Sequence, residues 1–211
     1  MKKFLMLIIA AVLMVPAMEA QNKTLQKALE KEYKSKMKEY KKGKWELFGS
    51  SRSLDVALLK HYEKLAELGD DAELVGVASG FKSKNVGHQM AVNNAYITYA
   101  QRAGSTLRGR VLSDMAGNAD DTNGEFDKFY AAYERAVEKE IKGELIESYS
   151  IIRQKPNSNG EYEMQTFFIV NETAASKARI RAMEEALKES EAAQKYAQKI
   201  SDFVNQKVDT E

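Results

Sequence analysis

The sequence contains no cysteine and only two prolines and two histidines. Without cysteine the chain cannot form disulfides, use a catalytic thiol or bind a metal through thiolates, and it offers no cysteine for lipidation. Two histidines leave little scope for a catalytic triad, and no serine lies in a G-x-S-x-G motif. The fold must therefore be held together by its apolar core.

Long apolar runs are also scarce, apart from one at the start. Phe4–Val15 is unbroken and apolar, follows two lysines and leads into the small and neutral residues VPAMEAQ. This order is typical of a secretory signal peptide. We expect residues 1–20 to be that peptide, with cleavage after Ala17 or Ala20, and the mature protein to be periplasmic or secreted. No later run approaches the ~18 residues of a membrane helix, so we expect no transmembrane segment in the mature chain.

Neither sign of charge is in excess, since 32 Lys and Arg residues face 31 Asp and Glu residues. A nucleic-acid-binding domain is usually basic throughout, so we expect no nucleic-acid partner. The lysines are nevertheless concentrated near the mature N-terminus. Residues 22–46 hold nine lysines and four glutamates.

This lysine-rich segment predicts a helix that ends near Gly43. Its apolar residues recur at helical spacing and form one stripe: Leu25, Leu29, Tyr33, Met37 and Tyr40. Two uses of the stripe are open. Either it docks on the protein's own core, or it meets a partner or an anionic surface that attracts the lysines. Interspersed glutamates favour docking: Glu30, Glu32 and Glu39.

Residues 21–211 are expected to form a single α+β domain, with this helix at its N-terminus. Helices are expected at 54–69 after Ser53, at 85–104, at 126–143 and at 173–208, the last bent near Ser190. Strands are expected at 72–83, 144–154 and 161–170, with a short extended piece in WELF, whereas 107–117 fits a helix or a strand. The turn KPNSNG makes the last two strands a hairpin. The predicted fold is a small antiparallel sheet, including this late hairpin, packed against several long helices.

The stretch GVASGFKS resembles a phosphate-binding loop but does not fit one. Gly76 and Gly80 are separated by three residues instead of four, and Phe81 separates the second glycine from Lys82. We therefore expect no bound nucleotide. In a strand Gly76 and Gly80 would share one face, where glycine permits the close approach of another backbone. We expect both to serve the fold.

An acidic loop gives a second incomplete match, to a calcium-binding EF loop. Asp121, Asn123 and Gly124 fit its third, fifth and sixth positions, but Ala119 and Tyr130 stand where the first and twelfth ligands belong. A solvated loop is the simpler interpretation. Thr122 and Glu125 fit a capping box for the following helix.

Neither histidine, His61 or His88, has a second histidine or a carboxylate at metal-ligand spacing. We expect both to be surface or packing residues. The sequence thus identifies no catalytic, cofactor-binding or metal-binding residues, and it predicts no cofactor.

Several segments together resemble a known family: ELVGVASGFKS, QMAVNNAYITYAQRAG, LRGRV and EYEMQTFFIV. The chain resembles the lipoprotein-20 family of bacterial envelope proteins over residues 72–190, and is similar to the N-terminal domain of a flagellar ring accessory protein. The resemblance implies a small α+β domain at the cell envelope without known enzymatic chemistry, and it supplies no catalytic residues. This chain departs from the lipidated members because it has no cysteine to acylate.

These observations favour an exported, non-catalytic interaction or structural module of the envelope. Its partner would be another envelope protein or an anionic surface. Two alternatives are an enzyme whose acid and base residues are dispersed along the sequence, and a protein that binds anionic surfaces through its basic N-terminal helix.

Overall fold

The computed structural model describes residues 27–69, 72–115, 123–195 and 197–205. The chain divides into two compact units, Met1–Trp45 and Glu46–Glu211, which are described separately. The predicted signal peptide, most of the acidic loop and Thr122 of the predicted capping box lie outside the described residues. The single domain expected for 21–211 stays a prediction.

In the first unit, residues 27–42 form the predicted lysine-rich helix. It ends as expected, with the backbone N–H of Gly43 donating to the Glu39 carbonyl at 2.8 Å. Just after the end of this helix, the residue with a left-handed backbone is Lys44, whose φ is 56°, and not Gly43. Two exposed ion pairs run along the helix, Lys34–Glu30 and Lys36–Glu39.

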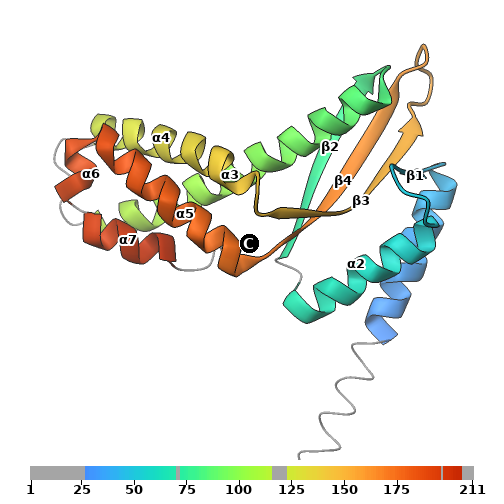
Figure 1. Ribbon diagram of the computed structural model, residues 1–211, viewed down its shortest axis with the longest axis horizontal. Coiled ribbons are helices and arrows are strands. Elements are labelled where there is room, and N and C mark those ends of the chain that lie inside the picture. Colours follow the sequence, from blue (N-terminus) through green and yellow to red (C-terminus); the bar gives the residue numbers. More distant parts are fainter. Residues whose placement is uncertain (1–26, 70–71, 116–122, 196, 206–211) are drawn as a thin grey trace, which may run out of the picture. The chain divides into compact units, whose positions relative to one another are not determined.

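The second unit has an α+β fold built on a four-stranded antiparallel sheet (Figure 1). The strands are β1 (Glu46–Phe48), β2 (Glu73–Phe81), β3 (Leu145–Gln154) and β4 (Tyr162–Val170), in the spatial order β1-β3-β4-β2. The predicted hairpin is confirmed as β3–β4. Its turn contains Asn157 and Gly160, both with positive φ. The short WELF segment supplies β1, and β2 forms the other edge.

The helices of this unit are α2 (Leu54–Leu68), α3 (Lys84–Met115), α4 (Asn123–Ile141), α5 (Glu172–Ala186), α6 (Glu191–Lys195) and α7 (Ala197–Asn205). Ser53 is the N-cap of α2, but its side chain makes no capping hydrogen bond. No helix in the described part of the chain is long and apolar enough to cross a membrane.

Helices α3 and α2 pack on opposite faces of the sheet. Successive side chains of a strand point to opposite faces. Two neighbouring residues of β4 therefore contact different helices. The ring of Phe168 lies 6.2 Å from that of Tyr96 on α3, measured between centroids, while Phe167 lies 5.9 Å from His61 on α2. The sheet is therefore covered by α3 on one side and contacted by α2 on the other.

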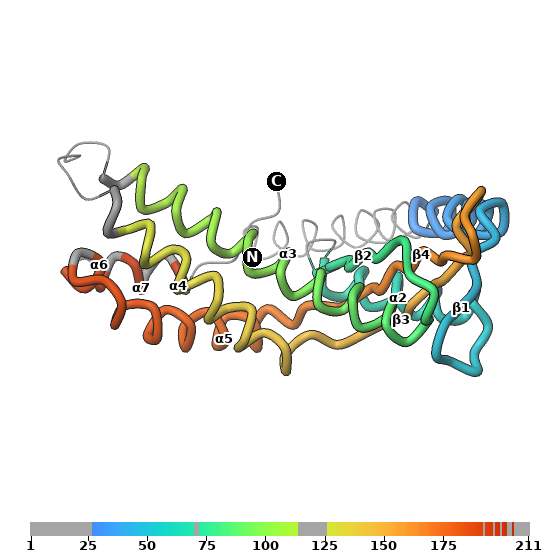
Figure 2. The backbone as a smooth tube through the Cα atoms, turned by 90° about the horizontal axis from the view of Figure 1, so that it is seen from above, coloured from blue at the N-terminus to red at the C-terminus, as the bar shows by residue number. Residues whose placement is uncertain are grey.

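Helix α3 continues well beyond the sheet and packs with α4, which packs in turn with α5 (Figures 1 and 2). Residues 107–117, which fit either a helix or a strand, are helical as far as Met115. The reason is the burial of Leu107 and Val111, four residues apart, in the core formed by the helices. This core contains the aromatic residues Phe126, Phe129, Tyr130 and Tyr133 of α4.

A buried arginine links three helices in this region. Arg179 of α5 is 1% exposed, and its guanidinium pairs with Glu172 at 2.5 Å and donates to the Tyr99 hydroxyl of α3 at 2.7 Å. It also donates to the Val204 carbonyl of α7 at 3.5 Å. Burial lowers the pKa of Arg179, but the hydrogen bonds and charge of Glu172, together with Tyr99, outweigh it and raise that pKa overall. The arginine therefore stays charged.

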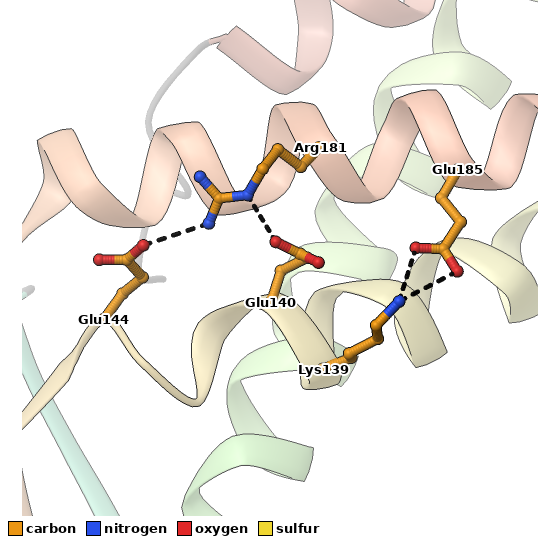
Figure 3. Close-up of polar contacts among 5 residues, drawn as sticks. All are labelled: Lys139, Glu140, Glu144, Arg181 and Glu185. Atoms are coloured by element: carbon orange, nitrogen blue, oxygen red, sulfur yellow. Dashed lines mark hydrogen bonds and ion pairs between the residues drawn. The ribbon is translucent and has the colours of Figure 1, made fainter.

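Ion pairs on the surface join α4 to α5. Arg181 of α5 donates to Glu140 at 2.5 Å and to Glu144 at 3.1 Å, and Lys139 lies 3.3 Å from Glu185 (Figure 3). Exposed pairs of this kind typically contribute between zero and about 1 kcal/mol. They align the two helices, and most of the stabilisation comes from the apolar core beneath them.

The C-terminal segment is not one helix. Where a helix over 173–208 with a bend near Ser190 was expected, the chain forms α5, a short 3-10 turn (Leu187–Glu189), α6 and α7. The break falls at Ser190, whose backbone is extended with φ −146° and ψ 115°. Its hydroxyl accepts from the Ala193 N–H at 3.2 Å and starts α6. The competition between a serine side chain and the helical backbone explains the break.

The two glycines of β2 have different roles. Gly76 lies directly beneath α3, where an added Cβ would stand 1.9 Å from the Ala91 carbonyl oxygen and 3.0 Å from the Ala95 Cβ. The close approach of another backbone, predicted from the lack of a side chain at Gly76, is therefore confirmed.

For Gly80 the prediction of a closely packed neighbour is wrong. The register of β2 against β4 shifts between Ser79 and Phe81, and Gly80 has a φ of +80°. An added Cβ would meet only the Glu161 carboxylate, at 4.0 Å. Gly80 forms a β-bulge, which needs the left-handed backbone that glycine tolerates. The bulge turns Phe81 into the core cluster with Ala78.

Candidate functional site

A chain of polar side chains lies on the α3 face of the sheet. The Nε2 atom of His88 lies 3.0 Å from Oε2 of Glu147, and the Ser150 hydroxyl is 2.6 Å from Oε1 of the same carboxylate. Ser150 also lies 2.9 Å from the Thr166 hydroxyl. The sequence contains no spacing signal for this group, because its members come from α3, β3 and β4.

A bulge in β3 brings Glu147 and Ser150 to the same face. Three residues apart in a regular strand, they would point to opposite faces. The register shifts between Glu147, which is opposite Phe168, and Tyr149, which is opposite Phe167. The extra residue restores a common face.

This group does not have the geometry of an activated nucleophile. A nucleophile must contact its base and also be reachable by a substrate. Glu147 contacts the Ser150 hydroxyl, and His88 contacts only Glu147, but the hydroxyl is buried. Ser150 is 1% exposed and Thr166 is fully buried. The His88 ring packs 5.5 Å from the Phe48 ring of β1, between centroids. The arrangement joins α3 to the sheet, as expected of a packing residue.

The other histidine also pairs with a carboxylate. His61 on α2 is 1% exposed, and its Nε2 lies 2.7 Å from Oε1 of Glu73 at the start of β2. Its ring is surrounded edge-on by Tyr62, Tyr149 and Phe167, at centroid distances of 5.2 to 6.2 Å. Among the described residues, Nδ1 has no hydrogen-bond partner. His61 is thus a packing residue that attaches α2 to the sheet.

Neither of the ligand-binding motifs weighed in the sequence forms a site within the described residues. Gly76 is covered by Ala91, and Lys82 is exposed beyond the end of β2, so no backbone cradle for a phosphate is present there. Over the described ranges, no group of three or more His, Cys, Asp or Glu residues could hold a metal ion. Asp121 and Ala119 of the calcium-loop match lie outside those ranges.

An open groove of about 280 Å³ lies between α3 and α4. It is lined by Ile97, Ala100, Gln101, Ala131, Glu134, Arg135 and Glu138. Arg135 pairs with Glu189 outside the groove lining, at 3.1 Å. The groove lacks the buried, convergent polar groups that orient a small ligand.

The most distinctive surface feature is apolar. Val86, Met90 and Ile97 of α3 are 53%, 41% and 38% exposed, and we call them the α3 strip. Their spacings of four and seven residues place them on one flank of the helix. Asn94 lies on the same flank and donates to the Val77 carbonyl of β2 at 2.7 Å. The α3 strip lies on the side of α3 turned away from Ala91 and Ala95, the residues that face Gly76, and Ile97 also lines the groove with α4. Val77 of β2, an edge strand among the described residues, is itself 51% exposed.

Sequence reasoning did not identify this surface. The strip belongs to a helix whose alanines and aromatic residues form the core-facing side, and Val86, Met90 and Ile97 look no different from core residues by composition. Only the exposure of these side chains in the folded unit shows which side of α3 the other described residues leave uncovered.

Comparison of the chain with protein-family models, curated proteins and solved structures finds no match.

Proposed function

We propose that the protein is an exported, non-catalytic interaction module of the bacterial cell envelope, similar to the lipoprotein-20 family but without a lipid anchor. The observation that carries the proposal is the exposed α3 strip. In a chain with 30% charged residues, a group of exposed apolar side chains on one flank indicates a surface used for binding.

The signal-peptide pattern at residues 1–20 supports the exported part of the proposal. N-terminal sequencing of the protein from fractionated cells tests it. We expect a mature chain that begins near Gln21 in the periplasmic or secreted fraction. Recovery of an intact Met1 on a cytoplasmic protein would contradict export.

The interaction is tested by crosslinking in living cells. A photoreactive amino acid placed at Met90 should give discrete crosslinked protein products. The same probe at Leu112, which is 50% exposed on α3 but about six turns further along, is the matched control and should give none. Equal crosslinking at the two positions would count against a binding role for the α3 strip.

A further inference from the structure

The lysine-rich helix of the first unit presents most of its lysines on one side. Successive residues of a helix are rotated by about 100°. On this geometry, six lysines of the helix at 27–42 fall within one arc of about 100°, and all six are exposed. We call these residues the lysine ridge: Lys27, Lys31, Lys34, Lys38, Lys41 and Lys42. They form a row about 22 Å long, nearly parallel to the helix axis.

The glutamates of this helix leave an excess of positive charge on the ridge. Glu30 borders the ridge and pairs with Lys34 at 2.5 Å. Glu39 lies on the other flank and pairs at 3.1 Å with Lys36, which is not a ridge residue. Lysines three or four residues apart on a helix repel each other. The ridge therefore weakens the helix, and a bound anion would relieve that repulsion.

The helix does not have the arrangement of one that enters a membrane surface. Such a helix buries an apolar face in the bilayer, while its lysines lie at the level of the lipid headgroups. Here the arc of the ridge contains only lysines within the described helix. Tyr40, in the apolar stripe on the opposite side, is 1% exposed. The side of the helix that faces solvent therefore has charge but no apolar residue to insert.

The ridge also lacks the features of a nucleic-acid site. Proteins that bind single strands stack the bases on aromatic side chains that lie among the basic residues. Within the described helix, Tyr33 and Tyr40 belong to the apolar stripe, and no aromatic residue lies on the ridge. The partner that remains is a polyanion without bases and without an apolar surface.

We propose that the lysine ridge binds a linear anionic polysaccharide that runs along the helix. A single extended polymer can contact all six ammonium groups, because the row follows the helix axis. Lysine binds anionic groups as a point charge on a flexible stem, so it does not require one fixed geometry of the anion. The ridge therefore selects its ligand by linear charge density.

This inference goes beyond the proposed function and concerns a different surface. The lysine ridge belongs to the unit Met1–Trp45, whereas the α3 strip belongs to Glu46–Glu211. Crosslinking at Met90 tests the α3 strip alone, and polysaccharide binding tests the ridge alone. The failure of either result leaves the other standing.

Fluorescence titration of the purified mature protein with labelled heparin, a linear sulfated polysaccharide, tests the proposal. We expect a micromolar dissociation constant at low ionic strength. The dissociation constant should rise steeply with salt, because binding releases counterions from the polymer. Neutral dextran should not bind.

Two triple variants with the same change in net charge separate the ridge from overall charge. Replacing Lys34, Lys38 and Lys41 by glutamine should raise the dissociation constant at least tenfold. It should also reduce the slope of log Kd against log salt by about half, since the slope is proportional to the number of contacts. The matched control replaces three exposed lysines of the second unit by glutamine and should leave both quantities nearly unchanged: Lys60, Lys64 and Lys82.

A charge exchange tests the arrangement of the ridge at constant composition. Lys38→Glu combined with Glu39→Lys moves one positive charge off the ridge and leaves the net charge as it was. This variant should also weaken heparin binding. Unaltered circular dichroism and melting temperature would show that the variants are folded, since the replaced side chains are exposed.

Absence of heparin binding at low ionic strength, or an equal loss in the two triple variants, would overturn the inference. Stronger binding to phosphatidylglycerol vesicles or to single-stranded DNA, at an equal concentration of negative charge, would overturn it as well. The partner would then be a membrane or a nucleic acid.

Discussion

At the scale of single residues, the packing of α3 on β2 depends on the absence of a side chain at Gly76. A Cβ there would stand 1.9 Å from the backbone oxygen of Ala91, and backbone cannot move aside as a flexible side chain can. We expect Gly76→Ala to lower the free energy of unfolding by about 1–3 kcal/mol through overpacking, measured by urea denaturation.

Gly109 supplies the control for this change. It lies in α3, and a Cβ added there would have nothing within 4 Å. Gly109→Ala should raise the free energy of unfolding by about 0.5–1 kcal/mol, because alanine restricts the unfolded chain and suits a helix. Equal effects at the two glycines would show that α3 does not press on β2.

A second residue-scale prediction concerns alkaline pH. Burial raises the pKa of Tyr130 to about 12, against a smaller opposing effect of the Arg108 guanidinium. Burial also raises the pKa values of Tyr99 and Tyr133. The folded state therefore holds these protons more tightly than the unfolded chain, whose tyrosines titrate near pH ~10. Their contribution to stability is complete below that pH and is lost as the pH rises toward 12.

Tyr130→Phe isolates one of these contributions. The Tyr130 hydroxyl has no hydrogen-bond partner among the described residues, so its removal should not destabilise the protein at neutral pH. The variant should lose stability less steeply with pH above ~10. Urea denaturation at several alkaline pH values measures this slope, and an unchanged slope would contradict the raised pKa.

At the scale of elements, the buried Arg179 of α5 pairs with Glu172 of the same helix and reaches α3 and α7 through Tyr99 and Val204. Arg179 is 1% exposed, whereas the Glu172 side chain is 36% exposed. Glu172→Gln removes the carboxylate that lies 2.5 Å from the buried guanidinium and should cost about 3 kcal/mol. Arg179→Met leaves a carboxylate that water can reach, so it should cost less. Thermal or urea denaturation of both variants tests this order.

The exposed α4–α5 pairs provide the comparison for this prediction. Arg181→Met removes two hydrogen bonds to carboxylates at the surface, to Glu140 and Glu144 (Figure 3). Water replaces them, and we expect little change in stability. A loss as large as that of Glu172→Gln would mean that these pairs, and not the buried arginine, hold the helices together.

At the scale of the whole molecule, the lysine-rich helix poses the main question left by the sequence. If its apolar stripe docks on the protein's own core, Leu29→Asp should clearly lower the melting temperature. Replacing Lys34, Lys38 and Lys41 by glutamine should then barely change it. Salt-sensitive sedimentation with anionic vesicles, lost in the lysine variant while Leu29→Asp melts normally, would instead indicate a helix that binds anionic surfaces.

The sequence by itself determined the fold class and most of its elements. Alternation and β-branched residues identified β2, the KPNSNG turn identified the β3–β4 hairpin, and helical periodicity identified α2 and most of α3 and α4. These patterns are local. When one face of a helix or strand is buried, its apolar residues must recur at the period of that helix or strand. The close packing at Gly76 is also predictable from the sequence. A strand face that carries glycine permits the close approach of another backbone, although the sequence does not show which segment approaches.

The tertiary structure alone decided which residues meet. The bulges at Gly80 and beside Glu147 shift the alternation by one residue, which no periodic pattern anticipates. The contact of Asn94 with Val77 joins residues from two elements, and no local pattern in the sequence predicts it. Such contacts depend on strand order and helix placement, which arise from packing of the whole unit, whereas periodicity specifies only the face that each element buries.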